Sequence, residues 1–278
     1  MKRLFYFLLL LFFGLKLSAQ QDDVKYTLRT SNASFGLSTM NITDNYISPL
    51  PYNGAGLKIM AENGRLYSPY TENLSVANRY KIDAATLSNP AQTASMMFLS
   101  LNFAWGMHYH FRPVKNLQIL TGGLWNADFG FKYNTRNVNN PFNMDLSANL
   151  NLSAIAIYDT SLFKRRFRLK AQLETPWIGC MFVPEQGASY YEIFSLGASG
   201  KFVHFSSFHN KQALCQTYSV EVPFVNSLWR IGFAGENSKH TANDMVFKKN
   251  NFTLFLGYTH VFSRFTRKNP APKNFVGY

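Results

Sequence analysis

Charged residues are scarce in this chain: Lys, Arg, Asp and Glu make up 15 % of its 278 residues, whereas an average soluble domain carries about 25 %. Cysteine occurs only twice, which excludes a disulfide-stapled scaffold. Several apolar runs of about 20 residues are also missing, which excludes a bundle of membrane helices. A disordered chain is excluded because such chains are poor in aromatic residues, and this one has 16 %, including 26 phenylalanines.

The first 19 residues have the pattern of an export signal. Lys2 and Arg3 supply positive charge, Leu4–Leu15 is an apolar stretch, and the small residue Ala19 precedes Gln20. A signal peptide has this order and an apolar core of about 7–15 residues. The alternative is a short N-terminal anchor, but this apolar run is too short to span a membrane. The sequence therefore predicts a cleaved signal peptide over residues 1–19 and no lipid anchor, because the junction lacks cysteine.

Most of the remaining chain alternates with period two between apolar and polar residues. From Met97 to Phe111 every odd position is apolar or aromatic, while the even positions include Ser100, His108 and His110. Side chains of a strand point alternately to its two faces, so each such strand has one apolar and one polar face. The chain is predicted to be all-β.

The length of the alternating stretches favours a membrane barrel over a soluble sandwich. Many of them run for about 10–16 residues, whereas strands of globular proteins have about 5–6. Their apolar faces end in aromatic residues, such as Tyr109 with Phe111 and Phe131 with Tyr133. Lipid-facing strands with aromatic ends are typical of antiparallel transmembrane β-barrels of the outer membrane. The alternative is a soluble periplasmic β-protein whose apolar faces line a core.

Ten strands are predicted, with twelve as the alternative if Ile193–Phe205 adds a hairpin. The candidates are Val24–Met40, Gly54–Glu62, Leu74–Thr86, Met96–Phe111, Leu117–Asn134, Asp145–Tyr158, Phe167–Trp177, Gln212–Phe224, Leu228–Glu236 and Phe252–Phe262. The longer connections, expected outside the cell, are Asn41–Asn53, Thr135–Met144, Ile178–Lys211 and Asn237–Asn251. Asn63–Asn73 falls on the periplasmic side although it is not short. The barrel is expected over residues 20–265, with a basic periplasmic tail over 266–278.

The phase of the strands directs a set of polar residues into the barrel. They are His108, His110, Asp128, Lys132, Asp145, Arg168, Lys170, Glu174, Glu221 and Arg230. Ten strands enclose a space only slightly wider than the eight-stranded barrel that side chains just fill. A plug of ion pairs and hydrogen bonds is the first interpretation. The second is a narrow pore that prefers anions.

Neither the histidines nor the cysteines define a cofactor site. His108 and His110 share a strand face, but no further metal ligand follows at a suitable spacing. Cys180 and Cys215 can pair only if their geometry permits it, which spacing does not decide. No metal or other cofactor is expected.

One short motif suggests catalysis. His204 and Ser206 are two residues apart, so both lie on one strand face, and Asn210 follows. This spacing is similar to the His-x-Ser motif of outer-membrane phospholipase A, in which His acts as base and Ser as nucleophile. The sequence here lacks that family's glycine-containing context, and the family has twelve strands. A lipid hydrolase using Ser206 and His204 is kept as an alternative.

Several segments resemble an uncharacterised family of outer-membrane proteins from Bacteroidota, a domain of unknown function. They are Tyr46-Ile47-Ser48-Pro49-Leu50, Tyr52-Asn53-Gly54, Ser189-Tyr190-Tyr191-Glu192-Ile193-Phe194 and Ser207-Phe208-His209-Asn210. The resemblance implies an outer-membrane barrel and implies no activity. It directs attention to Tyr190, Tyr191, Glu192, His209 and Asn210 in the external segment, since loops on a rigid scaffold commonly carry function.

The sequence as a whole predicts an outer-membrane β-barrel without catalytic activity, structural or ligand-binding through its external loops. Its expected partners are outer-membrane lipid or lipopolysaccharide and, during biogenesis, the barrel-insertion machinery. No nucleic-acid partner is expected, because no recognition motif is present. The alternatives are the small anion-biased pore and the lipid hydrolase.

Overall fold

The computed structural model describes residues 28–68, 71–137, 140–162, 165–195, 202–224 and 227–263. The predicted signal peptide and basic tail lie outside these residues. The strands are β1 (Leu28–Asp44), β2 (Ser48–Ser68), β3 (Thr71–Ser88), β4 (Ser95–Val114), β5 (Leu117–Asn134), β6 (Phe142–Leu162), β7 (Arg165–Phe182), β8 (Val203–Ser207), β9 (Lys211–Phe224), β10 (Ser227–Ala242) and β11 (Met245–Ser263). A short helix, α2 (Tyr190–Phe194), lies between β7 and β8.

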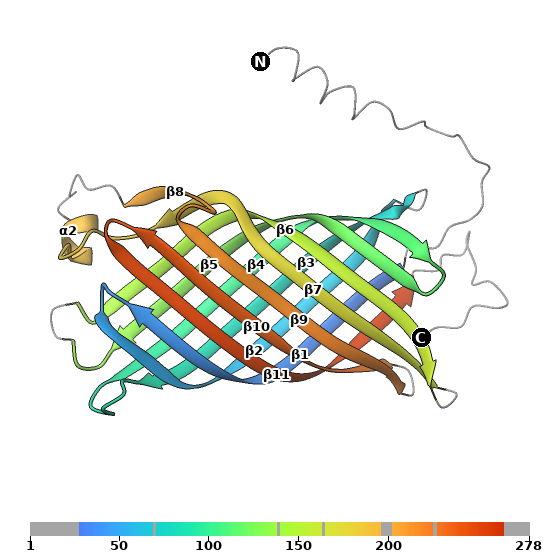
Figure 1. Ribbon diagram of the computed structural model, residues 1–278, viewed down its shortest axis with the longest axis horizontal. Coiled ribbons are helices and arrows are strands. Elements are labelled where there is room, and N and C mark those ends of the chain that lie inside the picture. The colour runs from blue at the N-terminus through green and yellow to red at the C-terminus, as the bar shows by residue number, and fades with distance from the viewer. Residues whose placement is uncertain are drawn as a thin grey trace, which may run out of the picture.

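Ten of the eleven strands form one closed antiparallel barrel (Figure 1). Each barrel strand pairs with the barrel strands before and after it in the chain, with β7 and β9 paired past β8. The strand β1 closes the ring by pairing with β11 along its whole length, from Leu28–Ser263 to Asp44–Phe247. The eleventh strand, β8, pairs only with the end of β7. The predicted fold class and the predicted number of ten barrel strands are therefore confirmed.

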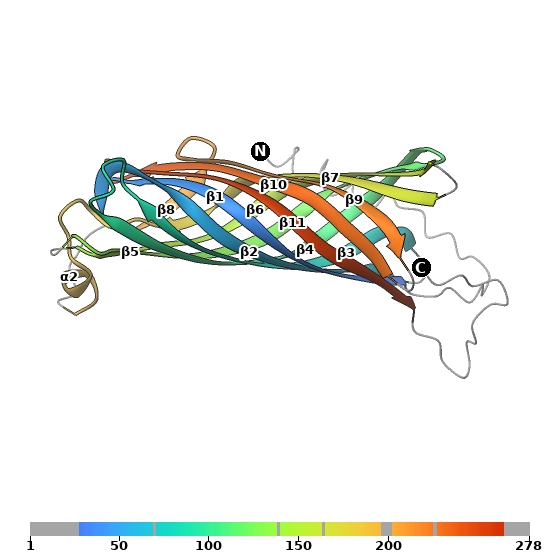
Figure 2. The same cartoon turned by 90° about the horizontal axis from the view of Figure 1, so that it is seen from below.

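The strands are strongly tilted to the barrel axis, as Figure 2 shows. Directly paired residues lead once around the wall from Arg168 through Glu221, Arg230, Gly257, Ser34, Met60, Lys81, Asn102, Asp128 and Ser147 back to β7 at Met181. The path returns 181 − 168 = 13 residues farther along β7, one of which belongs to the irregularity beside Leu150 and Asn151. Such a stagger is what closing a sheet with tilted strands requires.

The two faces of the wall differ as the alternation predicts. Large apolar side chains are exposed around the outside, among them Phe35, Leu37, Leu57, Ile59, Leu99, Leu101, Phe129, Leu150, Leu152, Leu173, Ile231 and Leu254. Aromatic side chains mark the end where β1 begins and β11 ends: Tyr109, Phe111, Tyr158, Trp229 and Tyr258. An apolar band bounded by aromatic residues is the outer face of an outer-membrane barrel. We call this end the terminal end and the opposite end the loop end.

Two of the predicted external connections are wrong, because the strands run on through them. Asn41–Asn53 is reduced to a turn at residues 45–47, and Asn237–Asn251 to a turn at Asn243 and Asp244. Both turn residues have positive φ, 50° and 58°, as a tight hairpin turn requires. The ladder continues beyond the apolar band, where outward side chains such as Lys248 and Asn250 are polar and inward ones such as Met40, Ile42 and Phe247 are apolar. The apolar face is thus on the inside here, so the alternation no longer matches that of a lipid-facing strand.

The remaining differences concern the other connections. Asn63–Asn73 is mostly strand, because β2 extends to Ser68 and β3 starts at Thr71, so the connection at the terminal end is short after all. The predicted external segment Ile178–Lys211 is also wrong at its start, since β7 continues to Phe182. In place of a twelve-strand hairpin over Ile193–Phe205, the structure has α2 and the short β8. No helix within the described residues is long and apolar enough to cross a membrane.

A charge on the outer face tests this architecture. Leu254 is 60 % exposed near the middle of β11. We expect Leu254→Arg to destabilise the barrel in lipid by about 2–4 kcal/mol, the usual cost of a cation facing hydrocarbon. Reversible urea unfolding in vesicles measures the difference, with Leu254→Met as the volume-matched control. An Arg variant as stable as the Met variant would mean that this face does not contact lipid.

Candidate functional site

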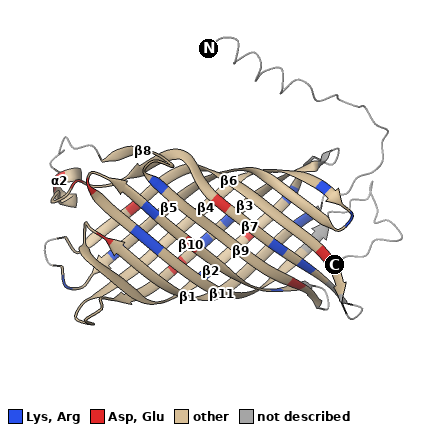
Figure 3. Ribbon diagram, in the orientation of Figure 1, with Lys and Arg blue, Asp and Glu red and all other residues tan. Residues whose placement is uncertain are grey.

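Residues of both charge signs are distributed along the barrel strands from the terminal end to the loop end (Figure 3), and many of them form ion pairs in the lumen. Near the terminal end, Arg168 Nε lies 2.7 Å from Asp159 Oδ1, and Lys170 Nζ lies 2.9 Å from Glu62 Oε1. Farther in are the pairs Arg230–Glu221, Arg79–Glu174, Lys58–Asp83 and Lys249–Glu236. Lys170–Glu62 and Arg79–Glu174 join β7 to β2 and β3 across the interior, whereas the other four pairs join neighbouring strands of the wall.

Lys132 is the most deeply buried of these cations, with no exposed side-chain surface. Its ammonium contacts the carboxylate of Asp44 and lies 2.7 Å from Asp145 Oδ2. Asn143 donates a hydrogen bond of 2.7 Å to the same oxygen of Asp44, and the ring of Phe247 lies 4.1 Å from the ammonium. A buried charge requires such a complete set of partners because it has lost its water.

Positive and negative side chains are balanced inside the barrel. Among the described residues, eight cations form ion pairs inside the barrel or line its interior cavity: Lys58, Arg79, Lys81, Lys132, Lys170, Lys211, Arg230 and Lys249. The corresponding carboxylates are those of Asp44, Glu62, Asp83, Asp128, Asp145, Glu174, Glu221 and Glu236. The formal charges of these two sets cancel. The chain's excess of 28 − 15 = 13 positive charges therefore comes from residues outside these sets.

Neutral polar groups complete the filling. Asn102 Nδ2 donates hydrogen bonds of 2.5 Å to Asn126 and Asp128. The two histidines bind separate hydroxyls, His108 that of Ser153 at 2.9 Å and His110 that of Ser75 at 2.7 Å. In the described part of the chain, no three His, Cys, Asp or Glu side chains are grouped to hold a metal ion. The histidine pair is thus part of the hydrogen-bonded interior.

A small cavity of about 90 Å³ remains on the loop-end side of the Arg79–Glu174 pair. Its lining includes Lys81, Asp128 and Lys211. Lys211 donates a hydrogen bond of 2.6 Å to Ser147. The cavity is large enough for a few water molecules only, since a water occupies about 30 Å³ of liquid.

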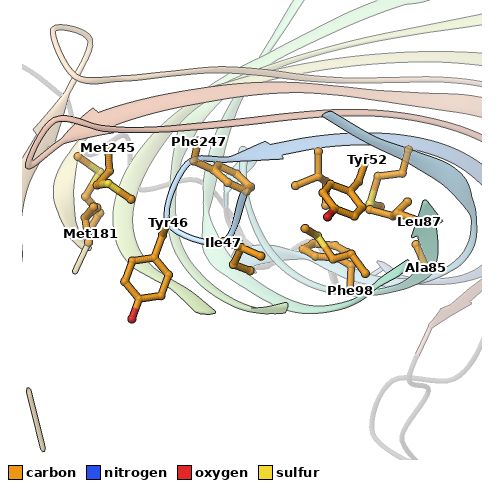
Figure 4. Packing of buried hydrophobic residues seen from close by; sticks show 13 residues of the cluster. Tyr46, Ile47, Tyr52, Ala85, Leu87, Phe98, Met181, Met245 and Phe247 are labelled. Atoms are coloured by element: carbon orange, nitrogen blue, oxygen red, sulfur yellow. The ribbon is translucent and has the colours of Figure 1, made fainter. Parts of the chain in front are cut away.

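Apolar side chains close the lumen above this cavity (Figure 4). The cluster consists of Met40, Ile42, Tyr46, Ile47, Tyr52, Ala85, Leu87, Met96, Phe98, Met181, Val183, Met245 and Phe247. These residues come from the loop-end portions of the strands and from the β1–β2 turn. They point inward where the alternation of an open channel would place polar groups, so the cluster forms an apolar cap.

The segment that carries α2 is fastened over the cap by two tyrosines. Tyr190 donates a hydrogen bond of 2.5 Å to Asn143 Oδ1 and accepts one of 2.8 Å from the Met144 amide. Tyr46 donates a hydrogen bond of 2.7 Å to the Ala188 carbonyl. Burial, together with Asp44 and Glu192, raises the pKa of Tyr46 to about 12, and burial likewise raises the pKa of Tyr190. Both phenols therefore keep the protons that they donate.

The start of α2 is fixed by a capping box. The Ser189 hydroxyl accepts a hydrogen bond from the Glu192 amide, and the Glu192 carboxylate accepts one of 2.7 Å from the Ser189 amide. These bonds lower the pKa of Glu192. Two of the motif residues named from the sequence thus have structural roles, whereas Tyr191 is exposed.

The hydroxyl of the candidate catalytic motif bonds a residue of another strand and not the imidazole. Ser206 is buried and donates to Asn149 Oδ1 at 2.7 Å, whereas the buried His204 Nε2 has no hydrogen-bond partner among the described residues. Asn210 bonds the backbone of Ser207 and Phe205 and does not orient His204. A local bond of 2.6 Å joins Ser207 to His209 at the exposed turn instead. Ser206, His204 and Asn210 therefore do not form the hydrogen bonds of a Ser–His–Asn triad in this structure.

All ten lumen residues expected from the sequence face the interior or its mouth, and others were missed. Asp44 and Lys249 were missed because both fell in predicted loops. Cys180 lies on the exposed outer side and Cys215 lines the cavity, and both thiols are free.

Removing the charge of Lys132 tests whether the ion pairs in the lumen stabilise the barrel. We expect Lys132→Met to destabilise the barrel by about 3–5 kcal/mol, because it leaves the carboxylates of Asp44 and Asp145 buried side by side without a cation. Adding Asp44→Asn should restore part of the loss. Urea unfolding followed by tryptophan fluorescence measures both variants. An unchanged Lys132→Met variant would show that the carboxylates need no cation.

Comparisons with known proteins return β-barrels of the same general kind. The outer membrane protease OmpT of Escherichia coli is 8 % identical, with 88 % of this chain and 99 % of that chain covered and a TM-score of 0.47. An outer membrane channel of Pseudomonas putida F1 is 10 % identical (88 % and 98 % covered, TM-score 0.35). The attachment invasion locus protein Ail of Yersinia pestis is 12 % identical (83 % and 97 % covered, TM-score 0.29).

Among curated protein sequences none matches. The sequence profile of one family does match, over residues 4–269, and this range includes every described strand and the segment that carries α2. The chain therefore belongs to the family described as a protein of unknown function, DUF3316.

Proposed function

We propose that this protein is an outer-membrane barrel that is exported by a cleaved signal peptide and acts by binding at its outer surface, without conducting solutes or catalysing a reaction. The apolar outer face and the aromatic residues at the terminal end support the membrane location. The assignment to Bacteroidota and to a specific outer-membrane family of that phylum is part of the same proposal.

The lengths of the connections orient the barrel. At the terminal end the strands are joined through residues 69–70, 115–116, 163–164 and 225–226 only. At the loop end the connections include residues 89–94, 135–141 and 183–202. Outer-membrane barrels have short periplasmic turns and longer external loops. We therefore propose that the loop end, with α2 and β8, faces the outside of the cell.

The filled lumen is the observation that carries the proposal. Ion pairs cross the barrel below the 90 Å³ cavity, and the apolar cap and α2 cover it from above. The charges within the lumen cancel, so the anion-biased pore gains no support from them. Because side chains fill the lumen, only the outer surfaces of the barrel are open to a binding partner.

The loop end presents an apolar surface on a well-fixed segment. Tyr191 and Phe194 of α2 and Val203 and Phe205 of β8 have exposed fractions between 60 % and 70 %. The tyrosine bonds of the α2 segment and the ladder between β7 and β8 hold this surface in place. Exposed apolar patches on an otherwise polar surface are typical of interaction sites. His209 and Asn210 lie beside it in the β8–β9 turn.

Conductance in a planar bilayer tests the closed lumen. We expect no steady current from the purified protein, and none after deletion of residues 184–202, because the ion pairs below the cap still block the passage. Simultaneous Arg79→Ala and Glu174→Ala, which empties one layer, serves as the comparison. Steady ion-selective currents from the unaltered protein would overturn the proposal in favour of the pore.

An ester-hydrolysis assay tests the absence of catalysis. We expect the protein in detergent micelles to release no fatty acid from phospholipid, and Ser206→Ala to behave identically, because the Ser206 hydroxyl donates to Asn149 and not to an imidazole. Activity that disappears in Ser206→Ala would establish the hydrolase instead.

A further inference from the structure

The ladder of the barrel wall is interrupted between β7 and β9. Pairing of these strands ends at Glu174 with Cys215, and β7 pairs again with β8 from Ile178 with Ser207 onward. Between these points the three residues 175–177 of β7 lie opposite the seven residues 208–214, which link β8 to β9 and begin β9. Pro176, in the middle of the three, has no N–H to donate. The excess residues fold outward as the turn at residues 208–210.

An external groove of about 360 Å³ lies beside this break. It is lined by Thr175, Phe208, Gln212, Ala213, Leu214, Asn237, Ser238, Lys239, Lys248 and Asn250. Gln212, Leu214, Asn237, Lys239, Lys248 and Asn250 are all exposed, so the floor of the groove is the outer face of β9, β10 and β11. The groove therefore opens to whatever surrounds the barrel near its loop end.

Two lysines face each other across this groove. Lys239 on β10 pairs directly with Lys248 on β11. Neither ammonium makes an ion pair with any side chain in the described ranges. Like charges directly opposite each other destabilise a sheet. A bound anion would remove this repulsion and replace it with two attractions.

The outward residues below the lysines change polarity in paired rows. From the loop end downward, the directly paired rows of β10 and β11 are Lys239 with Lys248, Asn237 with Asn250, Gly235 with Phe252, Phe233 with Leu254, and Ile231 with Leu256. Cations are thus followed by carboxamides and then by apolar side chains, with the rings of Phe233 and Phe252 stacked at 5.9 Å. A membrane lipid has the same order: a phosphate, hydrogen-bonding linkages, and acyl chains.

We propose that this groove binds a phosphate-bearing, acylated lipid of the leaflet at the loop end. The phosphate lies between Lys239 and Lys248, with Gln212 beside it in the same row. The carboxamides of Asn237 and Asn250 bond the linkages below it, and an acyl chain follows Leu214, Phe233 and Phe252. Single cations near a membrane surface attract anionic lipid weakly, and the ladder here presents two at a fixed spacing. The inference rests on the proposed membrane location and names a lipid partner for it.

The test is a titration of the purified full-length protein in neutral detergent micelles with lipid A carrying two phosphates, with the unfolding temperature as readout. We expect the phosphorylated lipid to stabilise the unaltered protein and dephosphorylated lipid A to do so far less. Lys239→Gln/Lys248→Gln should weaken apparent binding about tenfold or more. The control Lys115→Gln/Arg136→Gln removes the same charge from exposed positions away from the groove and should bind as the unaltered protein does.

The single variant Lys239→Gln gives a second test, because its effect on the unfolding temperature should change sign when lipid is added. In detergent without lipid, Lys239→Gln should unfold at a higher temperature than the unaltered protein because the repulsion is gone, and with phosphorylated lipid the order should reverse. Equal binding by the double variant and the unaltered protein would overturn the inference. Equal stabilisation by inorganic phosphate would also overturn it, in favour of a small-anion site. A negative result in this titration would not bear on the proposal that the lumen is closed. Steady currents in a planar bilayer would overturn that proposed function, but they would not change the outcome of the lipid titration.

Discussion

Closure of the wall is the constraint on which the rest of the structure depends. In hydrocarbon, each unpaired backbone N–H or C=O costs several kcal/mol, so a sheet that spans the membrane must pair its first strand with its last. The pairing of β1 with β11 along its full length fulfils this condition. Ten tilted strands then enclose a narrow space, and the side chains that point inward must satisfy one another there.

The composition of the lumen follows from that confinement. Cations and carboxylates enclosed together are stable only in compensated groups, because an unpaired buried charge is far more costly than a pair. Lys132 with Asp44 and Asp145 shows the arrangement at its most buried, and Arg79 with Glu174 shows it near the middle of the barrel. The apolar cap then seals the loop end with side chains that need no partners. The interior thus takes the place that the hydrophobic core has in a soluble domain.

The proposed binding function therefore lies at the outer surfaces. The balanced interior leaves the chain's excess positive charge outside the lumen sets, where Lys239 and Lys248 face each other over the groove. At the loop end, the bonds of Tyr46 and Tyr190 hold the α2 segment against the cap and expose Tyr191 and Phe194. Both surfaces depend on irregular features of the wall, the first on the ladder break at Pro176 and the second on the long β7–β8 connection.

The sequence by itself determined the all-β barrel and the direction of side chains such as His108, Lys132 and Glu174, because a strand's period of two fixes which face each residue takes. It favoured ten strands and left twelve open, and the structure decided for ten. It did not determine where strands end: beyond the apolar band the outward side chains are polar and the inward ones, such as Ile42 and Phe247, are apolar, and this inversion hid the hairpins at Asp44 and Met245. It also placed His204 and Ser206 together, whereas Ser206 bonds Asn149 of β6. Only the tertiary structure decided which charges pair across the ring, because the stagger of the closed wall brings distant residues to one level. Arg79 meets Glu174, 95 positions away, through the register of all the strands between them.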